Sequence, residues 1–120
     1  MTGVLILAHG SREKSTEGTL SEIVKELKQR ISDCTIETAF LQFSETNLKT
    51  GLDKLKAQGI SDIKVIPYFL FEGVHIREDI PSEIDEYKKD NPHMQISMGK
   101  ILGYDQRLAE ILADRVRETL

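Results

Sequence analysis

The segment Gly3-Val-Leu-Ile-Leu-Ala8, followed directly by His9-Gly10-Ser11-Arg12, decides the fold of this chain. The first six residues form a short, continuous apolar run, which is typical of a strand buried on both faces. Strands of this kind belong to parallel sheets that carry helices on both sides. We therefore expect residues 3–8 to form a central strand of an α/β fold.

Three more strands and four helices are predicted by the spacing of apolar residues along the rest of the chain. The strands are expected at residues 35–41, 62–67 and 95–101, with Pro67 at the end of its strand. Gly59 is placed to end the second helix in the left-handed conformation. We expect the third helix to begin at Asp79 as N-cap, with Pro81 in its first turn, and Asp105 to cap the last helix.

This alternation of strands and helices predicts one architecture. Right-handed crossovers place successive strands parallel to one another, with helices on both faces of the sheet. We thus expect a single α/β domain over residues 1–120, with a four-stranded parallel sheet of flavodoxin-like type.

Composition narrows the class of protein further. The chain has 120 residues, 39% of them hydrophobic, and a formal net charge of −4. The acidic balance disfavours a partner nucleic acid, and no apolar run approaches the roughly 18 residues that span a membrane. No signal-peptide pattern is recognisable, and the single cysteine, Cys34, excludes an intramolecular disulfide. We expect a cytoplasmic protein with no nucleic-acid or membrane partner.

Two of the three histidines fall where a ligand site is expected. In open α/β sheets ligands bind beyond the carboxyl ends of the strands. His9 follows the first strand and His75 the third, whereas His93 precedes the fourth and lies at the opposite edge. Either histidine alone is also compatible with a structural role.

The neighbours of the two histidines indicate the kind of ligand. Gly10, Ser11 and Arg12 can hold an anion such as a carboxylate, through backbone amides and one guanidinium. Apolar side chains before His75 can wall a flat aromatic ligand, although they are also compatible with ordinary core packing. Two histidines suit a borderline divalent metal but are too few for a closed zinc site, which favours transient metal binding. The residues of the apolar segment are Phe69, Phe71, Gly73 and Val74.

Four segments in order resemble the small class II chelatases, the short sirohydrochlorin chelatases of the CbiX type. They are residues 7–12 (LAHGSR), 39–43 (AFLQF), 65–75 (VIPYFLFEGVH) and 79–81 (DIP), with a further match at residues 102–105. The resemblance covers nearly the whole chain.

This resemblance implies insertion of a divalent metal into sirohydrochlorin, a tetrapyrrole with eight carboxylates, on a pathway such as cobalamin biosynthesis. It implies Co²⁺, or else Ni²⁺ or Fe²⁺, as a substrate with no permanently bound cofactor, and a homodimer of chains that each look like half of a two-lobed chelatase. His9 and His75 map onto the catalytic and metal-binding histidines. The substrate-binding residues expected with them are Gly10, Ser11, Arg12, Gln42, Phe69, Phe71, Gly73 and Val74.

One residue departs from the pattern of the family. Gln42 stands where relatives often carry Glu, and an amide cannot accept a proton at neutral pH. This change disfavours a mechanism with a third, acidic ligand and leaves the two-histidine mechanism intact. The main alternative function is a carrier that binds metal or tetrapyrrole without inserting one into the other. Phosphoryl transfer on His9 is a weaker one, because Arg12 is the only arginine near His9 in the sequence.

Overall fold

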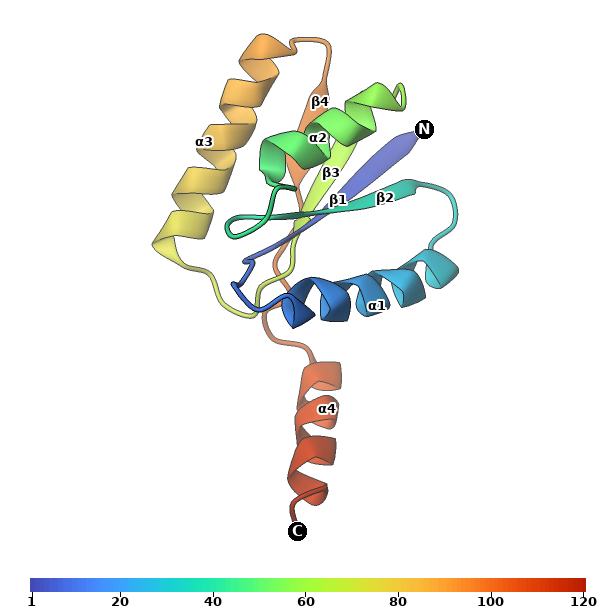
Figure 1. Cartoon of the computed structure of the whole chain (residues 1–120), viewed down its shortest axis with the longest axis vertical. Helices are drawn as coiled ribbons and strands as arrows, with labels where there is room; N and C mark the ends of the chain where they lie inside the picture. The colour runs from blue at the N-terminus through green and yellow to red at the C-terminus, as the bar shows by residue number, and fades with distance from the viewer.

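A computed structural model describes the chain from Met1 to Leu120, except for the side chain of His75. Strands and helices alternate along the chain (Figure 1). The elements are β1 (Thr2–Ala8), α1 (Ser15–Arg30), β2 (Thr35–Phe40), α2 (Leu48–Ala57), β3 (Asp62–Pro67), α3 (Val74–Asp90), β4 (Gln95–Met98) and α4 (Gln106–Arg117).

The four strands form one parallel sheet in the order β2-β1-β3-β4. This confirms the predicted fold class. The strand β1 lies inside the sheet, where Leu5 pairs with Glu37 of β2 and with Val65 of β3. Residues 5–8 are all buried, as the continuous apolar run predicted.

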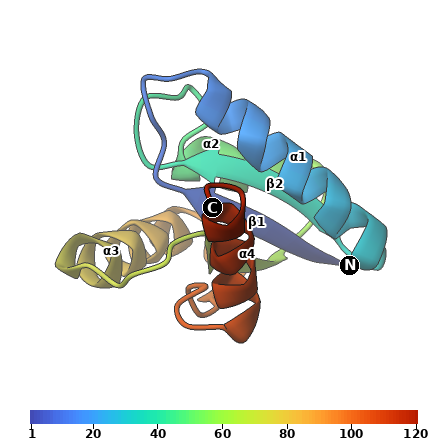
Figure 2. The same ribbon diagram turned by 90° about the horizontal axis from the view of Figure 1, so that it is seen from below.

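Helices cover both faces of the sheet, as expected (Figure 2). On one face α2 and α3 pack against Leu5, Leu7 and Val65, which are fully buried. On the other face α1 covers Ile6 and Phe40 through two buried side chains of its own. Each large aliphatic side chain buried in this way contributes about 1.5–3 kcal/mol relative to exposure.

The strands β1 and β3 leave the sheet toward opposite faces, since β1 leads into α1 and β3 leads toward α3. The two strands are neighbours, so their carboxyl ends flank a point where the winding of the chain reverses. Ligands of open α/β sheets bind in such a crevice. The fold thereby places the segments after Ala8 and after Pro67 side by side.

The third helix begins earlier than predicted. It starts at Val74, with Gly73 as its N-cap, so Asp79 and Pro81 lie inside the helix. The prediction was wrong because Pro81 was taken as a first-turn residue. The apolar stripe in fact extends one turn further back, since Ile76 lies four residues before Ile80 and packs against the same core. As a consequence His75 is the second residue of α3, not part of a loop.

The second and fourth strands are shorter than predicted, ending at Phe40 and Met98. After β4 the chain turns away at Gly99, where a Cβ would lie 2.6 Å from the Cδ1 atom of Ile66. Leu102 then donates a backbone hydrogen bond to Phe69. Residues 99–105 therefore cross behind the segment that follows β3. Gly59, with a φ of 81°, follows the C-cap residue of α2 as predicted.

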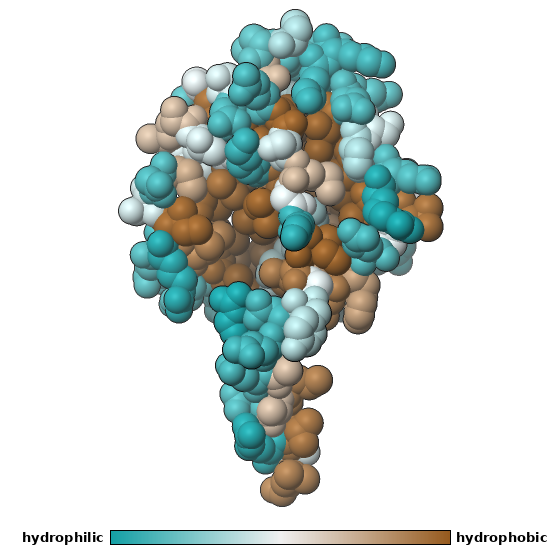
Figure 3. Space-filling model, turned by 180° about the vertical axis from the view of Figure 1, so that it is seen from behind, coloured by the Kyte–Doolittle hydropathy of each residue, from teal (hydrophilic) through white to brown (hydrophobic). Residues whose placement is uncertain are grey.

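The last helix, α4, projects from the body of the molecule (Figure 1), which has extents of 54 × 32 × 27 Å. Asp105 caps it as predicted, accepting a hydrogen bond from the amide of Arg107, and the Arg107 guanidinium holds the pKa of that carboxyl below its usual range. None of the residues of α4 is buried, and hydrophobic residues line one edge of the helix (Figure 3). None of the helices in the described structure is long and apolar enough to cross a bilayer.

Candidate functional site

The site is built around His9, which follows the last residue of β1 and is exposed at the carboxyl end of the sheet. Its ring meets that of Phe69 edge to face, with centroids 5.9 Å apart and planes at 83°. Phe69 is half-buried and packs against the main core, which fixes the aromatic ring against which His9 rests. The structure thus brings together one residue from the segment after β1 and one from the segment after β3.

Gly10 is required by the close approach of two loops. Its φ is 90°, and a Cβ at this position would lie 2.0 Å from the backbone oxygen of Gln42. The amide of Gln42 in turn donates to the backbone oxygen of His9 at 3.2 Å. The loop after β1 and the loop after β2 are therefore locked together at the site, and the predicted residues His9, Gly10 and Gln42 are adjacent.

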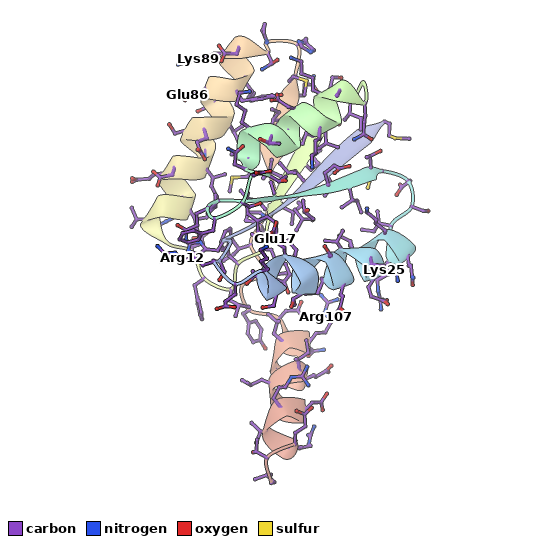
Figure 4. All side chains as sticks on the ribbon, viewed as in Figure 1. Arg12, Glu17, Lys25, Glu86, Lys89 and Arg107 are labelled. Atoms are coloured by element: carbon purple, nitrogen blue, oxygen red, sulfur yellow. The ribbon has the colours of Figure 1, made fainter. Side chains whose placement is uncertain are left out.

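The hydroxyl of Ser11 accepts a hydrogen bond from the amide of Glu13 at 3.1 Å. It therefore shapes the turn into α1 and keeps its own proton for donation. Arg12 is exposed, and its guanidinium carbon lies 5.1 Å from the centroid of the Phe43 ring. Figure 4 labels Arg12 at the carboxyl end of the sheet. Both residues stand where a bound anion can reach them.

A hollow of about 450 Å³ opens beside His9, between the loop after β2 and α3. Its apolar wall is formed by Leu41, Ile76 and Ile80. Its remaining lining is polar and mostly acidic, and comes from one side of α3: Asp79, Ser82, Glu83 and Glu86. The surroundings of His9 are therefore acidic on the side of α3, whereas Arg12 supplies a positive charge from the loop after β1.

His75 lies in the first turn of α3, but its side chain falls outside the described part of the structure. Its expected pairing with His9 across the site stays a prediction. Within the described residues no three metal-binding side chains form a cluster.

Not all of the expected substrate-binding residues lie at His9. Gly73 and Val74 are exposed at the beginning of α3. Phe71, with 81% of its surface exposed, lines a different hollow of about 620 Å³ between its own loop and α4. The structure therefore separates Phe69, which touches His9, from Phe71, which faces the apolar side of α4.

Sequence reasoning missed Phe43 as a residue of this site. The available signal was an aromatic residue between Gln42 and Ser44, in the loop that follows a buried strand. Its contact with Arg12 joins loops about 30 residues apart, and the pattern of one loop does not show how it meets another.

The fold and the site together define a class of protein. It is a parallel α/β domain with a histidine and an aromatic residue at the point where the winding of the chain reverses. The CbiX family model matches residues 3–119. The chain therefore belongs to the CbiX family.

Individual relatives agree with this assignment. The chain is 35% identical over 120 residues to a sirohydrochlorin cobaltochelatase of Priestia megaterium, covering 99% of this chain and 39% of the relative. It is 31% identical to a sirohydrochlorin cobaltochelatase of Sulfurisphaera tokodaii, covering 100% of this chain and 95% of the relative.

Among solved structures, the sirohydrochlorin chelatase of Bacillus subtilis subspecies spizizenii in complex with cobalt superposes with a TM-score of 0.89 at 29% identity. The match covers 98% of this chain and 50% of that one. This chain thus spans less than half of the Priestia relative and half of the Bacillus structure, but nearly all of the Sulfurisphaera relative.

Proposed function

We propose that this chain is a sirohydrochlorin chelatase that inserts a divalent metal into the macrocycle. The observation that carries the proposal is the match along nearly the full length of a short cobaltochelatase, with His9 at the carboxyl end of β1. The reaction exchanges two pyrrole N–H protons for one M²⁺ and releases two protons. The metal is a substrate, and no resident cofactor is part of the proposal.

The residues of the site divide this work between them. His9 and His75 hold the metal over the ring. When the metal passes to the pyrrole nitrogens it leaves the imidazole of His9, whose freed nitrogen can then accept a pyrrole proton. The ring lies against the apolar segment after β3, with Phe69 between it and the core. Arg12, together with the hydroxyl of Ser11, binds carboxylates of the substrate. The net charge of −4 opposes a polyanion, so this local positive charge decides where the macrocycle docks.

The acidic side of the hollow beside His9 suits the second substrate, the divalent metal ion. Carboxylates from α3 line the hollow next to His9 and attract a divalent cation toward it. We expect Co²⁺ as the metal, with Ni²⁺ and Fe²⁺ as further candidates, because imidazole accepts all three ions. A reducing cytoplasm is the expected setting, since it keeps the lone Cys34 as a thiol.

A homodimer is part of the proposal, supported by α4. An isolated helix of 12 residues is marginal in water unless its apolar face is covered. Ile111, Leu112 and Val116 are each at least half exposed, so α4 needs a partner surface. A second copy of the chain supplies one, consistent with a fold that spans half of the Bacillus chelatase.

The test is anaerobic metallation of sirohydrochlorin with Co²⁺, followed by absorption against a protein-free control. We expect many turnovers per chain, and repetition with Ni²⁺ and Fe²⁺ ranks the metals. Stoichiometric binding of the ring without turnover would replace the enzyme by a carrier. In that case the first variant to test is Gln42→Glu, which restores the carboxylate that relatives often have at this position.

A further inference from the structure

The loop after β2 contains a strained residue that the proposed chemistry does not use. Phe43 has a φ of 59°, and within the described residues it is the one non-glycine with a positive φ. In this left-handed region the Cβ atom crowds the neighbouring carbonyl oxygen, so bulky residues rarely adopt it. Conformations of this kind persist where the surrounding structure imposes them, which is frequent at functional sites.

Hydrogen bonds on both sides of Phe43 impose this conformation. Before it, the amide of Gln42 donates to the backbone oxygen of His9 at 3.2 Å. The amide of Phe40 donates to the backbone oxygen of Thr46 at 2.8 Å, a hydrogen bond that spans Phe43. After Phe43, the Ser44 hydroxyl donates to a carboxylate oxygen of Glu17 in α1 at 3.1 Å. The loop is thus tied to β1, to itself and to α1.

The strained loop carries an aromatic ring at the surface. Phe43 is 51% exposed, and the guanidinium carbon of Arg12 lies 5.1 Å from its ring centroid, within the range of a cation–π contact. In the described structure Arg12 has no acidic partner, in contrast to Arg107, which pairs with Asp105 at 2.8 Å. The charge of Arg12 is therefore free for a ligand.

We propose that Phe43 is a positioning residue that holds the guanidinium of Arg12 ready to bind a carboxylate of the substrate. A guanidinium held over an aromatic face keeps its N–H groups available at its edge for an anion. Holding the side chain in place beforehand lowers the entropy that binding costs. This inference rests on the proposed function, because the carboxylate belongs to sirohydrochlorin.

The experiment compares the steady-state metallation kinetics of the wild type with three variants, with Co²⁺ held constant. Phe43→Leu removes the ring and raises the KM for sirohydrochlorin about threefold, while kcat stays within twofold. Phe43→Tyr keeps the ring and restores the wild-type KM. Arg12→Gln removes the charge and raises KM about tenfold.

The double variant shows whether Phe43 acts through Arg12. In the Arg12→Gln background, Phe43→Leu has no further effect on KM, because the group that it positions is already gone. A KM that Phe43→Leu leaves unchanged, or raises equally in both backgrounds, overturns the proposal. Phe43→Gly relieves the strained φ, so we expect it to unfold at no lower temperature than the wild type although its KM rises.

Failure of the proposed function is recognised separately. Wild-type protein that binds sirohydrochlorin without metallating it overturns the proposed enzyme activity. The role of Phe43 is then tested by the dissociation constants for the metal-free ring, which are compared between the variants and the wild type in place of KM. Wild-type protein that does not bind the ring overturns both.

Discussion

At the scale of single residues, the site depends on how closely the loops after β1 and β2 approach each other. Gly10 permits that approach, with a φ of 90° and the backbone oxygen of Gln42 in the place of a side chain. Gly18 offers a contrast within the same chain, since it lies in α1 with open space around it. The two glycines therefore respond to substitution in opposite ways.

We expect Gly10→Ala to lower the free energy of unfolding by about 2 kcal/mol or more, because the new Cβ must displace the backbone of Gln42. Gly18→Ala is the matched control and raises the free energy of unfolding by about 0.5–1 kcal/mol, since alanine favours the helix. Urea denaturation measures both values. A stable Gly10→Ala protein with normal metallation would show that the approach of the loops is unimportant.

The position of the candidate residues at the carboxyl end of β1 could be predicted, but not their contacts. His9, Gly10 and Arg12 were recognisable because they directly follow an apolar strand in a fold whose ligands bind at strand ends. The left-handed conformation of Phe43 is imposed by hydrogen bonds that the loop donates to His9, directly after β1, and to Glu17 in α1. Propensity within the loop contains no information about such bonds.

At the scale of elements, α2 and α3 are joined by hydrogen bonds at their shared surface. The hydroxyl of Tyr87 donates to Asp53 at 2.6 Å, and Lys56 donates to the side-chain oxygen of Asn91 at 2.6 Å. Burial, reinforced by the hydrogen bond to Asp53, raises the pKa of Tyr87, and the same hydrogen bond lowers the pKa of Asp53. These shifts make the packing of α3 dependent on pH.

The raised pKa of Tyr87 predicts a loss of stability in alkali. Above about pH 10 this tyrosine loses its proton in the unfolded chain but keeps it in the folded chain. The free energy of unfolding therefore falls as pH rises. We expect Tyr87→Phe to cost about 1 kcal/mol at pH 7 and to remove up to about 1.4 kcal/mol per pH unit of the alkaline slope.

Denaturation between pH 8 and 11 measures this slope. Tyr104→Phe is the matched control, since in the described structure that exposed hydroxyl makes no hydrogen bond. If the free energy of unfolding had the same alkaline slope in Tyr87→Phe and in the wild type, the raised pKa of Tyr87 would be contradicted.

The beginning of α3 shows where reading elements from sequence fails. Proline is favoured in a first turn, which led to a predicted start at Asp79, but the apolar stripe through Ile76 overrides that preference. Tertiary packing decides such a boundary. The outcome matters for the site, because it places His75 on a helix.

At the scale of the whole molecule, α4 stands apart from the packed body. Its apolar side and the loop of Leu70 and Phe71 line an open hollow of about 620 Å³. The amides of Leu102 and Gly103 donate to the backbone oxygen of Phe69, at 2.9 and 3.4 Å. The connection to α4 is thus fastened to the backbone of Phe69, whose ring contacts His9.

The proposed homodimer is tested on α4 itself. Leu112→Gln places an amide in the apolar stripe, which costs about 1–3 kcal/mol if it is buried without a partner. A twofold interface contains the substitution from both chains, so the dissociation constant of the dimer increases at least tenfold. Glu110→Gln introduces the same side chain at an exposed charged position of α4 and leaves the dimer intact.

Sedimentation at micromolar concentration measures the dissociation. A wild-type protein that is monomeric at every concentration would contradict the proposed homodimer.

The proposed role of His9 in the insertion of metal into sirohydrochlorin is tested by one comparison. Initial rates of Co²⁺ insertion are measured under anaerobic conditions for the wild type, His9→Ala and His93→Ala, the last an exposed histidine just before β4. We expect the rate of His9→Ala to fall at least 100-fold, to near the protein-free rate, whereas the rate of His93→Ala matches that of the wild type. A His9→Ala protein as fast as the wild type would contradict it.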